Sequence, residues 1–250
     1  MNFTIDHQLA HRSVRAFQNR PLSDDELGTL LAVARQTATS MGMQCSGIVR
    51  VTDQALKDRL AAIGCQKSLA LTPEVWVFIV DTARNRAILD ERAASSAVPE
   101  SLGAFLDGFT DACLMAQNVV NAAESMGLGT VYYGCINCDA QAVIDALKLP
   151  ALTFPVVGLG IGHPAQDPAK KPRMPMELRV SENAYERPES WSEALKGYDA
   201  EVAAYYGTRN EGRDRETFTS QVVAMQSDFW GKRSEVAQVI ARQGFGSDAS

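Results

Sequence analysis

The feature that most constrains the fold of this sequence is a long segment with the pattern of one continuous helix, at residues 101–126. It contains no proline, and its interior glycines, Gly103 and Gly108, come early. Apolar residues recur on more than one side of the predicted helix, which is typical of a central, buried helix. Gly127 and Gly129 then end it, because glycine readily adopts the left-handed conformation that follows many helices. We therefore expect this helix to lie at the centre of the core.

Shorter elements are predicted on both sides of this helix along the chain. Residues 74–81 (EVWVFIVD) are almost continuously apolar, which is typical of a strand buried on both faces. A helix at 23–38 begins with a capping box, in which Ser23 and Glu26 satisfy each other's backbone amides. The other predicted strands lie at 45–52, 130–134 and 153–162, and the other predicted helices at 53–64 and 139–147.

The C-terminal part of the chain follows a proline-rich, basic loop at 164–175. From residue 190 onward it has the pattern of polar amphipathic helices, with too little apolar density for a core of its own. We expect one domain over residues 1–250, in which about 176–250 form a helical excursion packed on the core or on a partner subunit.

Composition limits the classes of partner. The 250 residues are 46% hydrophobic and 22% charged, which is ordinary for a globular enzyme. A net charge of −6 argues against nucleic acid or an anionic membrane as the main partner. We find no apolar run of membrane-spanning length and no secretory signal pattern at the start. Five cysteines without such a signal predict a reduced, cytoplasmic chain.

The first candidate site is the basic segment HRSVR near the N-terminus. It places His11, Arg12, Ser13 and Arg15 within five residues. Arginine donates paired, charge-assisted hydrogen bonds to phosphate oxygens, and serine adds a further donor. The segment therefore indicates an anion site, although a solvated basic turn has the same composition.

A second basic cluster lies in the proline-rich loop. Lys171 and Arg173 flank Pro172, which fixes the local chain and restricts the directions in which the two cations point. Alone, this cluster is weak evidence for an anion site. It indicates such a site only together with another group that binds the same anion.

Three glycines, Gly158, Gly160 and Gly162, follow a predicted strand and invite a dinucleotide-binding interpretation. Their spacing differs from GxGxxG, and His163-Pro164 stands where a helix should begin. We expect instead that these glycines allow close packing of the strand.

Cysteines with a redox-type spacing stand between a predicted strand and a predicted helix. Cys135 and Cys138 form a CxxC pair, which is compatible with a dithiol site or with plain packing. A metal site is disfavoured because no second pair completes four ligands. The other cysteines, Cys45, Cys65 and Cys113, have apolar neighbours, and we expect them in the core.

In their order along the chain, these features resemble the nitroreductase family, specifically its NADPH-dependent nitroreductase and flavin reductase group. The resemblance covers about residues 8–215 and rests on several ordered segments. These segments are HRSVRAF, QCSGIVRVTD, CQK, MAQNVVNAAESMGLGTVYYG, KLP, KPRMP and YYGTR. Their combination is far more specific than any one of them.

The resemblance implies an α+β fold with a mixed, mostly antiparallel sheet between helices, built as an intertwined homodimer. It further implies FMN at the subunit interface and ping-pong hydride transfer from NADPH to a nitroaromatic, a quinone or a related acceptor. The flavin carries the hard chemical step, so no protein nucleophile is required. Two rivals stay open: a flavin reductase that supplies reduced FMN, and a non-catalytic flavin or thiol redox sensor.

The resemblance also implies roles for individual residues. Those expected at the FMN phosphate are His11, Arg12, Ser13 and Arg173. Those expected at the ring or ribityl chain are Thr39 and Gln66, with either Arg15 or Lys171 at the N1–C2=O edge. Those expected over one ring face are Tyr132, Tyr133 and Gly134, with the Gly134 amide near N5. Those expected at the 2′-phosphate of NADPH are Arg209 and Arg213. The chain departs from the family pattern at Thr39, where serine is usual, and at Cys135, where a second glycine is usual.

Overall fold

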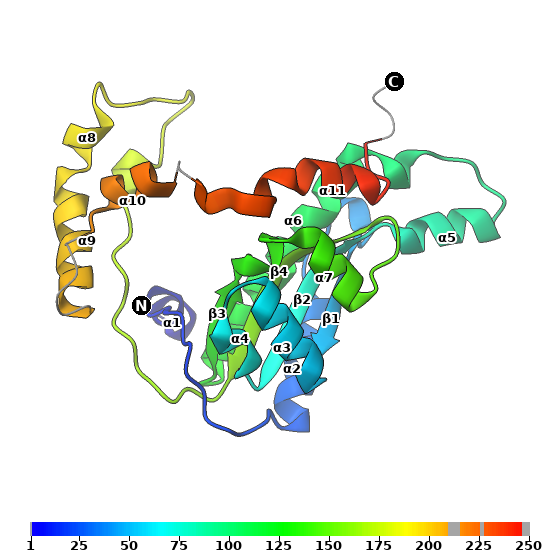
Figure 1. Cartoon of the computed structure of the whole chain (residues 1–250), viewed down its shortest axis with the longest axis horizontal. Helices are drawn as coiled ribbons and strands as arrows, with labels where there is room; N and C mark the ends of the chain where they lie inside the picture. Colours follow the sequence, from blue (N-terminus) through cyan, green and yellow to red (C-terminus); the bar gives the residue numbers. More distant parts are fainter. Residues whose placement is uncertain (1, 210–215, 226–227, 247–250) are drawn as a thin grey trace. The chain divides into compact units, whose positions relative to one another are not determined.

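The structure is a computed structural model that describes residues 2–209, 216–225 and 228–246 (Figure 1). It divides into two compact units. Unit 1 is Met1–Pro168 with Lys232–Ser250, and unit 2 is Ala169–Gly231. The expected single domain with a helical excursion from about residue 176 stays a prediction.

Among the described residues, four strands form one sheet in the order β1-β2-β4-β3. The strands are β1 (Ser46–Val51), β2 (Glu74–Asp81), β3 (Gly129–Tyr133) and β4 (Thr153–Gly162). All three strand pairs are antiparallel, and a parallel bridge joins Ser13 to Thr130 beside β3. The predicted α+β class is therefore confirmed, and the predicted strands agree with the observed ones to within one residue at each end.

The central strand β2 supplies both hydrophobic layers. Its side chains alternate between two buried clusters because successive residues of a strand point to opposite faces. The two sets are Trp76, Phe78 and Val80, and Val75, Val77 and Ile79. The predicted burial of this strand on both faces is confirmed, since positions 74–80 are all buried.

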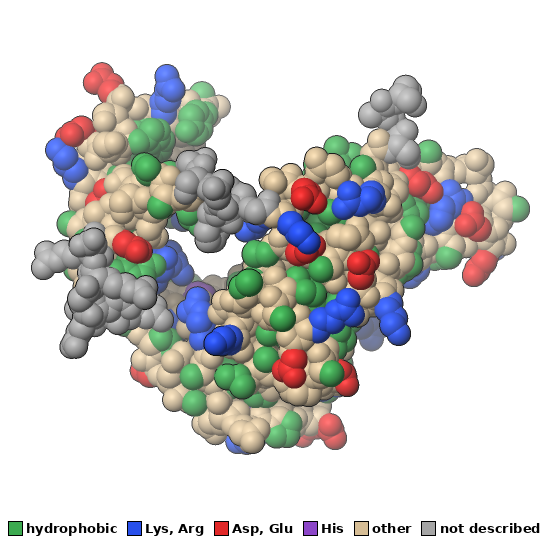
Figure 2. Space-filling view, in the orientation of Figure 1, with side chains coloured by type: hydrophobic (Ala, Val, Ile, Leu, Met, Phe, Trp, Pro, Cys, Tyr) green, Lys and Arg blue, Asp and Glu red, His purple; other side chains and the backbone are tan. Residues whose placement is uncertain are grey.

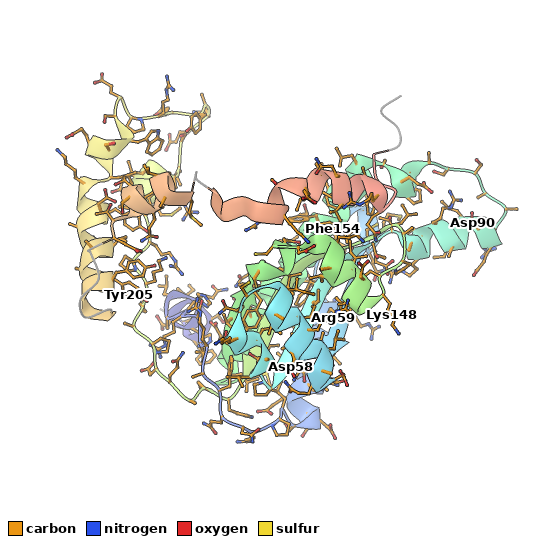
Figure 3. The ribbon with its side chains drawn as sticks, viewed as in Figure 1. Asp58, Arg59, Asp90, Lys148, Phe154 and Tyr205 are labelled. Carbon is orange, nitrogen blue, oxygen red and sulfur yellow. The ribbon has the colours of Figure 1, made fainter. Side chains whose placement is uncertain are left out.

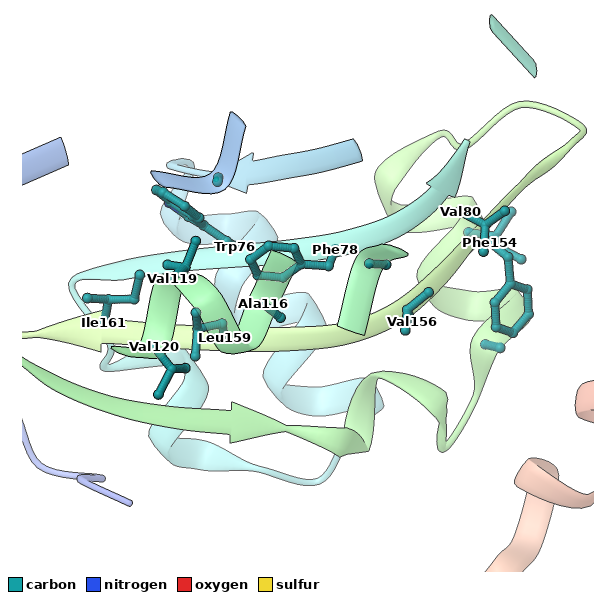
Figure 4. Close-up of a cluster of buried hydrophobic side chains, with 14 of the residues drawn as sticks. Trp76, Phe78, Val80, Ala116, Val119, Val120, Phe154, Val156, Leu159 and Ile161 are labelled. Atoms are coloured by element: carbon teal, nitrogen blue, oxygen red, sulfur yellow. The ribbon is translucent and has the colours of Figure 1, made fainter. Parts of the chain in front are cut away.

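The long predicted helix is α6 (Leu102–Ser125), and it covers one face of the sheet. Figure 4 shows its Ala116, Val119 and Val120 packed over β2 and β4. Helix α2 (Asp24–Arg35) packs beside α6 and begins with the predicted capping box at Ser23. It ends three residues earlier than predicted, at Arg35.

The other face of the sheet carries shorter helices. These are α3 (Gln54–Ile63), α4 (Lys67–Ala70) and α7 (Ala140–Leu147). Asp53 and Asp139 cap α3 and α7 as their positions in the sequence indicate. Figure 3 labels Asp58 and Arg59 on α3, where both side chains are exposed.

The expectation that the long helix α6 is buried around most of its surface is wrong for the single chain. The buried residues of this helix lie along one stripe, whereas several large apolar side chains on the rest of its surface are exposed. These are Leu102 (52%), Leu106 (56%), Phe109 (36%) and Leu114 (48%). The single chain buries one face of α6 and leaves an apolar surface of unusual extent on a helix this long.

Unit 2 contains helices around a small core of its own, which differs from the expectation of none. Its main elements are α8 (Trp191–Ala194), α9 (Lys196–Arg209) and α10 (Phe218–Met225). Leu195, Tyr198 and Val202 are buried together, and the ring of Tyr198 packs against that of Phe218 at 5.3 Å. Two aromatic residues concentrate enough apolar area to make this cluster without a high overall apolar content.

The remaining elements are short. They are α1 (Phe3–Leu9), η1 (Ser40–Gly42), α5 (Ala83–Glu91), η2 (Val98–Glu100), η3 (Gly134–Asn137), η4 (Met176–Leu178), η5 (Asp228–Glu235) and α11 (Val236–Arg242). Within the described ranges, none of the helices has the length and apolar character needed to cross a membrane.

Candidate functional site

The predicted anion-binding segment is attached to the first residues of β3. The Val14 amide donates to the Thr130 carbonyl at 2.8 Å, and Val14 itself is buried. A Cβ on Gly129 would lie 2.8 Å from the Val14 side chain, so only glycine permits this close approach. Because Val14 points inward, its neighbours Ser13 and Arg15 are left at the surface.

A carboxylate on α6 fixes the histidine of this segment. His11 Nδ1 donates to Glu124 Oε1 at 2.7 Å, and the Thr130 hydroxyl donates to the same oxygen at 2.6 Å. The Glu124 side chain is only 11% exposed, whereas that of His11 is 31% exposed. With Nδ1 committed to Glu124, the other ring nitrogen of His11 remains for a ligand.

The arginines of the segment are accessible. Arg12 pairs with Asp167 at 2.7 Å, and both side chains are largely exposed. A surface pair of this kind contributes about 0–1 kcal/mol, so an anion with several oxygens can replace Asp167 at small cost. The Arg15 side chain is exposed, and its backbone amide donates at 2.9 Å to Gln166 when the Gln166 amide oxygen faces it.

A cavity of about 640 Å³ lies beside this segment. Its lining joins the N-terminal segment to the end of α6 and to the loop after β4. The residues are His7, Ala10, Arg12, Val14, Glu124, Gly127, Leu128, Gly129, Pro164, Ala165, Gln166 and Asp167. The structure therefore gathers the first basic cluster around a hollow of ligand size, in agreement with an anion site.

At the far end of β3 the surface is open. Apart from Gly134 and its two chain neighbours, no described residue has an atom within 4 Å of the position that a Cβ on Gly134 would occupy. The rise of about 3.3 Å per residue puts Gly134 about 13 Å from Thr130 along the strand. A distance of this size suits an elongated ligand, such as a flavin mononucleotide, whose phosphate and ring lie at opposite ends.

The two tyrosines expected over one ring face differ in exposure, and their role at the ring stays a prediction. Successive side chains of β3 point to opposite faces, so the Tyr132 and Tyr133 rings cannot cover the same surface. Tyr132 is 36% exposed and donates to Gln117 at 3.3 Å, whereas Tyr133 is 2% exposed. Burial raises the pKa of both phenols. Only the backbone of Tyr133 is placed to touch a ligand beside Gly134.

A hydrogen-bond network explains the inward position of Tyr133. Its hydroxyl shares a 2.6 Å hydrogen bond with Thr72, whose carbonyl accepts from the buried amine of Lys57 at 3.1 Å. Burial lowers the pKa of Lys57. Gln66 is the residue directly before the short helix α4, and its side-chain amide donates to the Ser68 hydroxyl at 2.9 Å. The network fixes the segment that carries Gln66 against the inner side of β3.

Thr39 lies beside the middle of α6, away from the C-terminal end that carries Glu124. The amide of its neighbour Ser40 donates to the buried carboxylate of Asp111 at 2.8 Å, whereas His11 binds Glu124. Thirteen residues of helix separate Asp111 from Glu124, which is about 20 Å at 1.5 Å per residue. One chain therefore does not bring Thr39 to the basic segment.

The second basic cluster belongs to unit 2. Lys171 and Arg173 are exposed, and the Lys171 amine lies 5.4 Å from the centre of the Tyr206 ring. Arg209 is the last residue of α9, and its side chain is outside the described part of the chain. Arg213 also lies outside the described residues. The expected roles of these four residues at FMN and at the 2′-phosphate of NADPH stay predictions.

The cysteines differ from expectation in part. All five lie within the described residues and none is in a disulfide. Cys45 is buried as predicted, but Cys65 and Cys113 are exposed. Cys65 follows the end of α3, and Cys113 lies on the exposed side of α6. Cys135 is half-buried and Cys138 exposed, both in the turn that follows β3.

The glycine-rich strand has the role that the sequence indicates. A Cβ on Gly160 would lie 2.8 Å from the Tyr133 ring, and a Cβ on Gly162 would lie 2.9 Å from the Phe17 ring. The glycines therefore admit aromatic side chains against β4. The strand continues into a loop rather than a phosphate-binding helix.

Sequence reasoning missed Glu124, Gln166 and Thr72. A signal existed for Glu124, which continues the buried stripe of Ala116 and Val120 at four-residue spacing. A carboxylate on such a stripe needs a partner. Gln166 and Thr72 carry no comparable signal, because their partners are far away in the sequence.

The surface charge is mixed. On the face of unit 1 in Figure 2, lysine and arginine side chains alternate with aspartate and glutamate. This face differs from the continuous basic stripe that is typical of nucleic-acid binding.

Comparisons with known proteins identify the family of the chain. The family model described as "Nitroreductase family" matches residues 9–163, and "Nitroreductase family, C-terminal domain" matches residues 171–248. An oxygen-insensitive NADPH nitroreductase of Salmonella typhimurium is 40% identical, over 89% of this chain and 90% of the relative. An FMN reductase (NADPH) of Bacillus subtilis is 34% identical, over 89% and 91%.

Solved structures agree as well. The structure of B. megaterium NfrA1 has a TM-score of 0.92 and 34% identity, covering 98% of this chain and 100% of that chain. The NADPH:FMN oxidoreductase from Vibrio harveyi, complexed with NAD+, has a TM-score of 0.86 and 32% identity, covering 98% and 100%.

Proposed function

The chain belongs to the nitroreductase family, and from this premise we propose that it is an FMN-dependent oxidoreductase. It takes hydride from NADPH and reduces nitroaromatics, quinones or related acceptors by two electrons, as the names of its relatives suggest. The observation that carries this proposal is the arrangement along β3. An accessible basic segment lies at the start of the strand, and the open surface at Gly134 lies at its end.

The phosphate end of FMN fits the start of β3. His11, Arg12 and Ser13 supply donors there, and Glu124 orients the histidine. Arg173 of unit 2 is assigned to the same phosphate on the family resemblance. A ligand with two negative charges suits this end because charge-assisted hydrogen bonds to phosphate are short and strong.

The ring end fits the open surface beyond β3. Gly134 leaves room for a flat ligand, and Gln66 and the Arg15 guanidinium are assigned to its polar edge. Either Arg15 or Lys171 stabilises negative charge at the N1–C2=O edge. Bound FMN supplies the hydride acceptor and donor, so the protein has only to bind the substrates, orient them and exclude water.

The active form is a homodimer in this proposal. The exposed Leu106, Phe109 and Leu114 of α6 form an apolar surface that a second copy would cover. Thr39 supports the same conclusion, since it lies about 20 Å along α6 from the basic segment and reaches a shared FMN only from the partner protomer. The proposal includes a cytoplasmic location, where thiols remain reduced, and the described cysteines are all free.

The test starts with the purified protein. We expect a yellow protein that releases about one FMN per chain on denaturation, because one phosphate site per chain is assigned. A colourless protein that takes up no added FMN would refute the proposal. With NADPH and a quinone, double-reciprocal plots should be parallel, since both substrates use one site in turn. Converging lines would show that both substrates bind together.

A flavin reductase is the second candidate, because the B. subtilis relative is named an FMN reductase and the V. harveyi relative an NADPH-flavin oxidoreductase. The two functions differ in the preferred acceptor. Turnover with free FMN far above that with quinones and nitroaromatics would favour the reductase. A protein that oxidises at most one equivalent of NADPH would be a sensor rather than an enzyme.

A further inference from the structure

The turn after β3 places two thiols on one side. Cys135 and Cys138 are three residues apart in and after η3, and the Cys138 amide donates to the Cys135 carbonyl at 3.0 Å. In a 3₁₀ turn the side chains at i and i+3 eclipse each other. A rise of about 2 Å per residue separates their Cα atoms by about 6 Å. Disulfides span about 4.4–6.8 Å between Cα atoms, so the turn has the right size for one.

The two residues between the cysteines anchor the turn. Ile136 is 1% exposed in the core, and the Asn137 side-chain amide donates to the Val156 carbonyl at 2.7 Å. These contacts hold the backbone of the turn in place, and they leave Cys135 half-buried and Cys138 exposed.

We propose that Cys135 and Cys138 form a thiol-oxidation site, which closes into an intramolecular disulfide when a peroxide acts on Cys138. The Cys138 thiolate attacks one oxygen of hydrogen peroxide, the O–O bond breaks, and hydroxide leaves. The Cys135 sulfur then attacks the sulfur of the resulting sulfenic acid, and the S–O bond breaks. Two thiols and one peroxide become one disulfide and two waters.

The environment decides which thiol acts first. Cys138 is exposed to peroxide, whereas burial and the neighbouring thiols raise the pKa of Cys135 to about 11. Because the thiolate is the nucleophile, Cys135 is the slower of the two at neutral pH. Closure of the disulfide therefore accelerates as the pH rises from neutral, until Cys135 is ionised.

A third thiol provides an internal control. Cys65 follows Gly64, where a Cβ would lie 2.7 Å from Cys135 Sγ, so the end of α3 packs directly against this thiol. However, Cys65 has a left-handed backbone (φ 50°), and its own Sγ points toward the Ala62 carbonyl at 3.8 Å. The Cys65 side chain therefore points back over α3, so Cys65 is not the partner of Cys135.

The test counts thiols and maps the bond, and it needs no turnover, so it is independent of the proposed function. The full-length protein is treated with hydrogen peroxide, denatured, and reacted with a thiol-specific chromophore. The count should fall from five free thiols to three, out of the five cysteines in the chain. Peptide mapping should find Cys135 joined to Cys138, and the count should return to five after reduction with dithiothreitol.

Three variants separate the roles. Cys65→Ser should still form the disulfide. Cys138→Ser should keep its four thiols under the same treatment, and Cys135→Ser should trap a sulfenic acid on Cys138 that reacts with dimedone. A disulfide that includes Cys65, oxidation of Cys138 to sulfinic acid while Cys135 stays a thiol, or no loss of thiols would each overturn the proposal.

Discussion

Glu124 should stabilise both the fold and the cofactor end of the site. Its Oε1 accepts hydrogen bonds from His11 at 2.7 Å and from Thr130 at 2.6 Å, and Thr130 is 1% exposed. A hydrogen bond to a charged group contributes about 1.5–3 kcal/mol. The His11 bond is discounted to about 1 kcal/mol at most, because that ring is one-third exposed.

Glu124→Ala should therefore lower the free energy of unfolding by about 2–4 kcal/mol, since the Thr130 hydroxyl is left buried without an acceptor. Glu124→Gln keeps a carbonyl oxygen for Thr130 and should cost about 1 kcal/mol. Urea unfolding of the flavin-free protein measures both values. FMN affinity should fall about tenfold for Glu124→Ala, which corresponds to about 1.4 kcal/mol for a histidine no longer oriented.

The matched control is Glu91→Ala, at the exposed last residue of α5. It should change stability by less than about 0.5 kcal/mol and leave FMN affinity unchanged. A Glu124→Ala protein as stable as the wild type would show that the buried carboxylate costs as much as its bonds contribute. Equal losses for the glutamine and alanine variants would show that charge alone matters, and the hydrogen-bond argument would then be wrong.

Three further predictions test other parts of the molecule. Gly160→Ala should destabilise the protein by about 1–3 kcal/mol in urea unfolding, since its Cβ would lie 2.8 Å from the Tyr133 ring, and an unchanged midpoint would refute this packing. Alkylation of Cys135 by iodoacetamide, followed by peptide mass spectrometry, should rise with pH toward a midpoint near its pKa of about 11, and a midpoint below 9 would contradict its burial. Arg209→Ala should lower kcat/KM for NADPH about ten- to hundredfold while NADH is nearly unaffected, as loss of a charge-assisted bond to the 2′-phosphate requires. Equal losses with both nucleotides would assign Arg209 to structure instead.

Elements whose signals are local were predicted from the sequence. The capping box at Ser23 and the apolar run of β2 depend on residues close together in the chain. Hydrogen bonds across three residues and a continuous apolar strand leave few alternatives, so the predicted boundaries agree with the structure to within a few residues. The basic segment at His11 was found for the same reason, because charge density is visible without the fold.

Orientation at the site was decided by tertiary structure. Both tyrosines at the end of β3 were assigned to one ligand face, but strand alternation and the Thr72 hydroxyl turn the Tyr133 side chain into the core. The sequence contains the alternation, yet it does not say which face of β3 is inner until α3 and α4 pack there.

The sequence by itself determined the family, the fold class, the positions of the strands and the chemistry of the candidate ligands. Only the tertiary structure joined Glu124 to His11, put Thr39 beside the middle of α6, and left apolar side chains of that helix exposed. The physical reason is distance along the chain. Local hydrogen bonds and periodicity are set by neighbours, whereas a contact across 113 residues forms only when packing of the sheet brings two elements together.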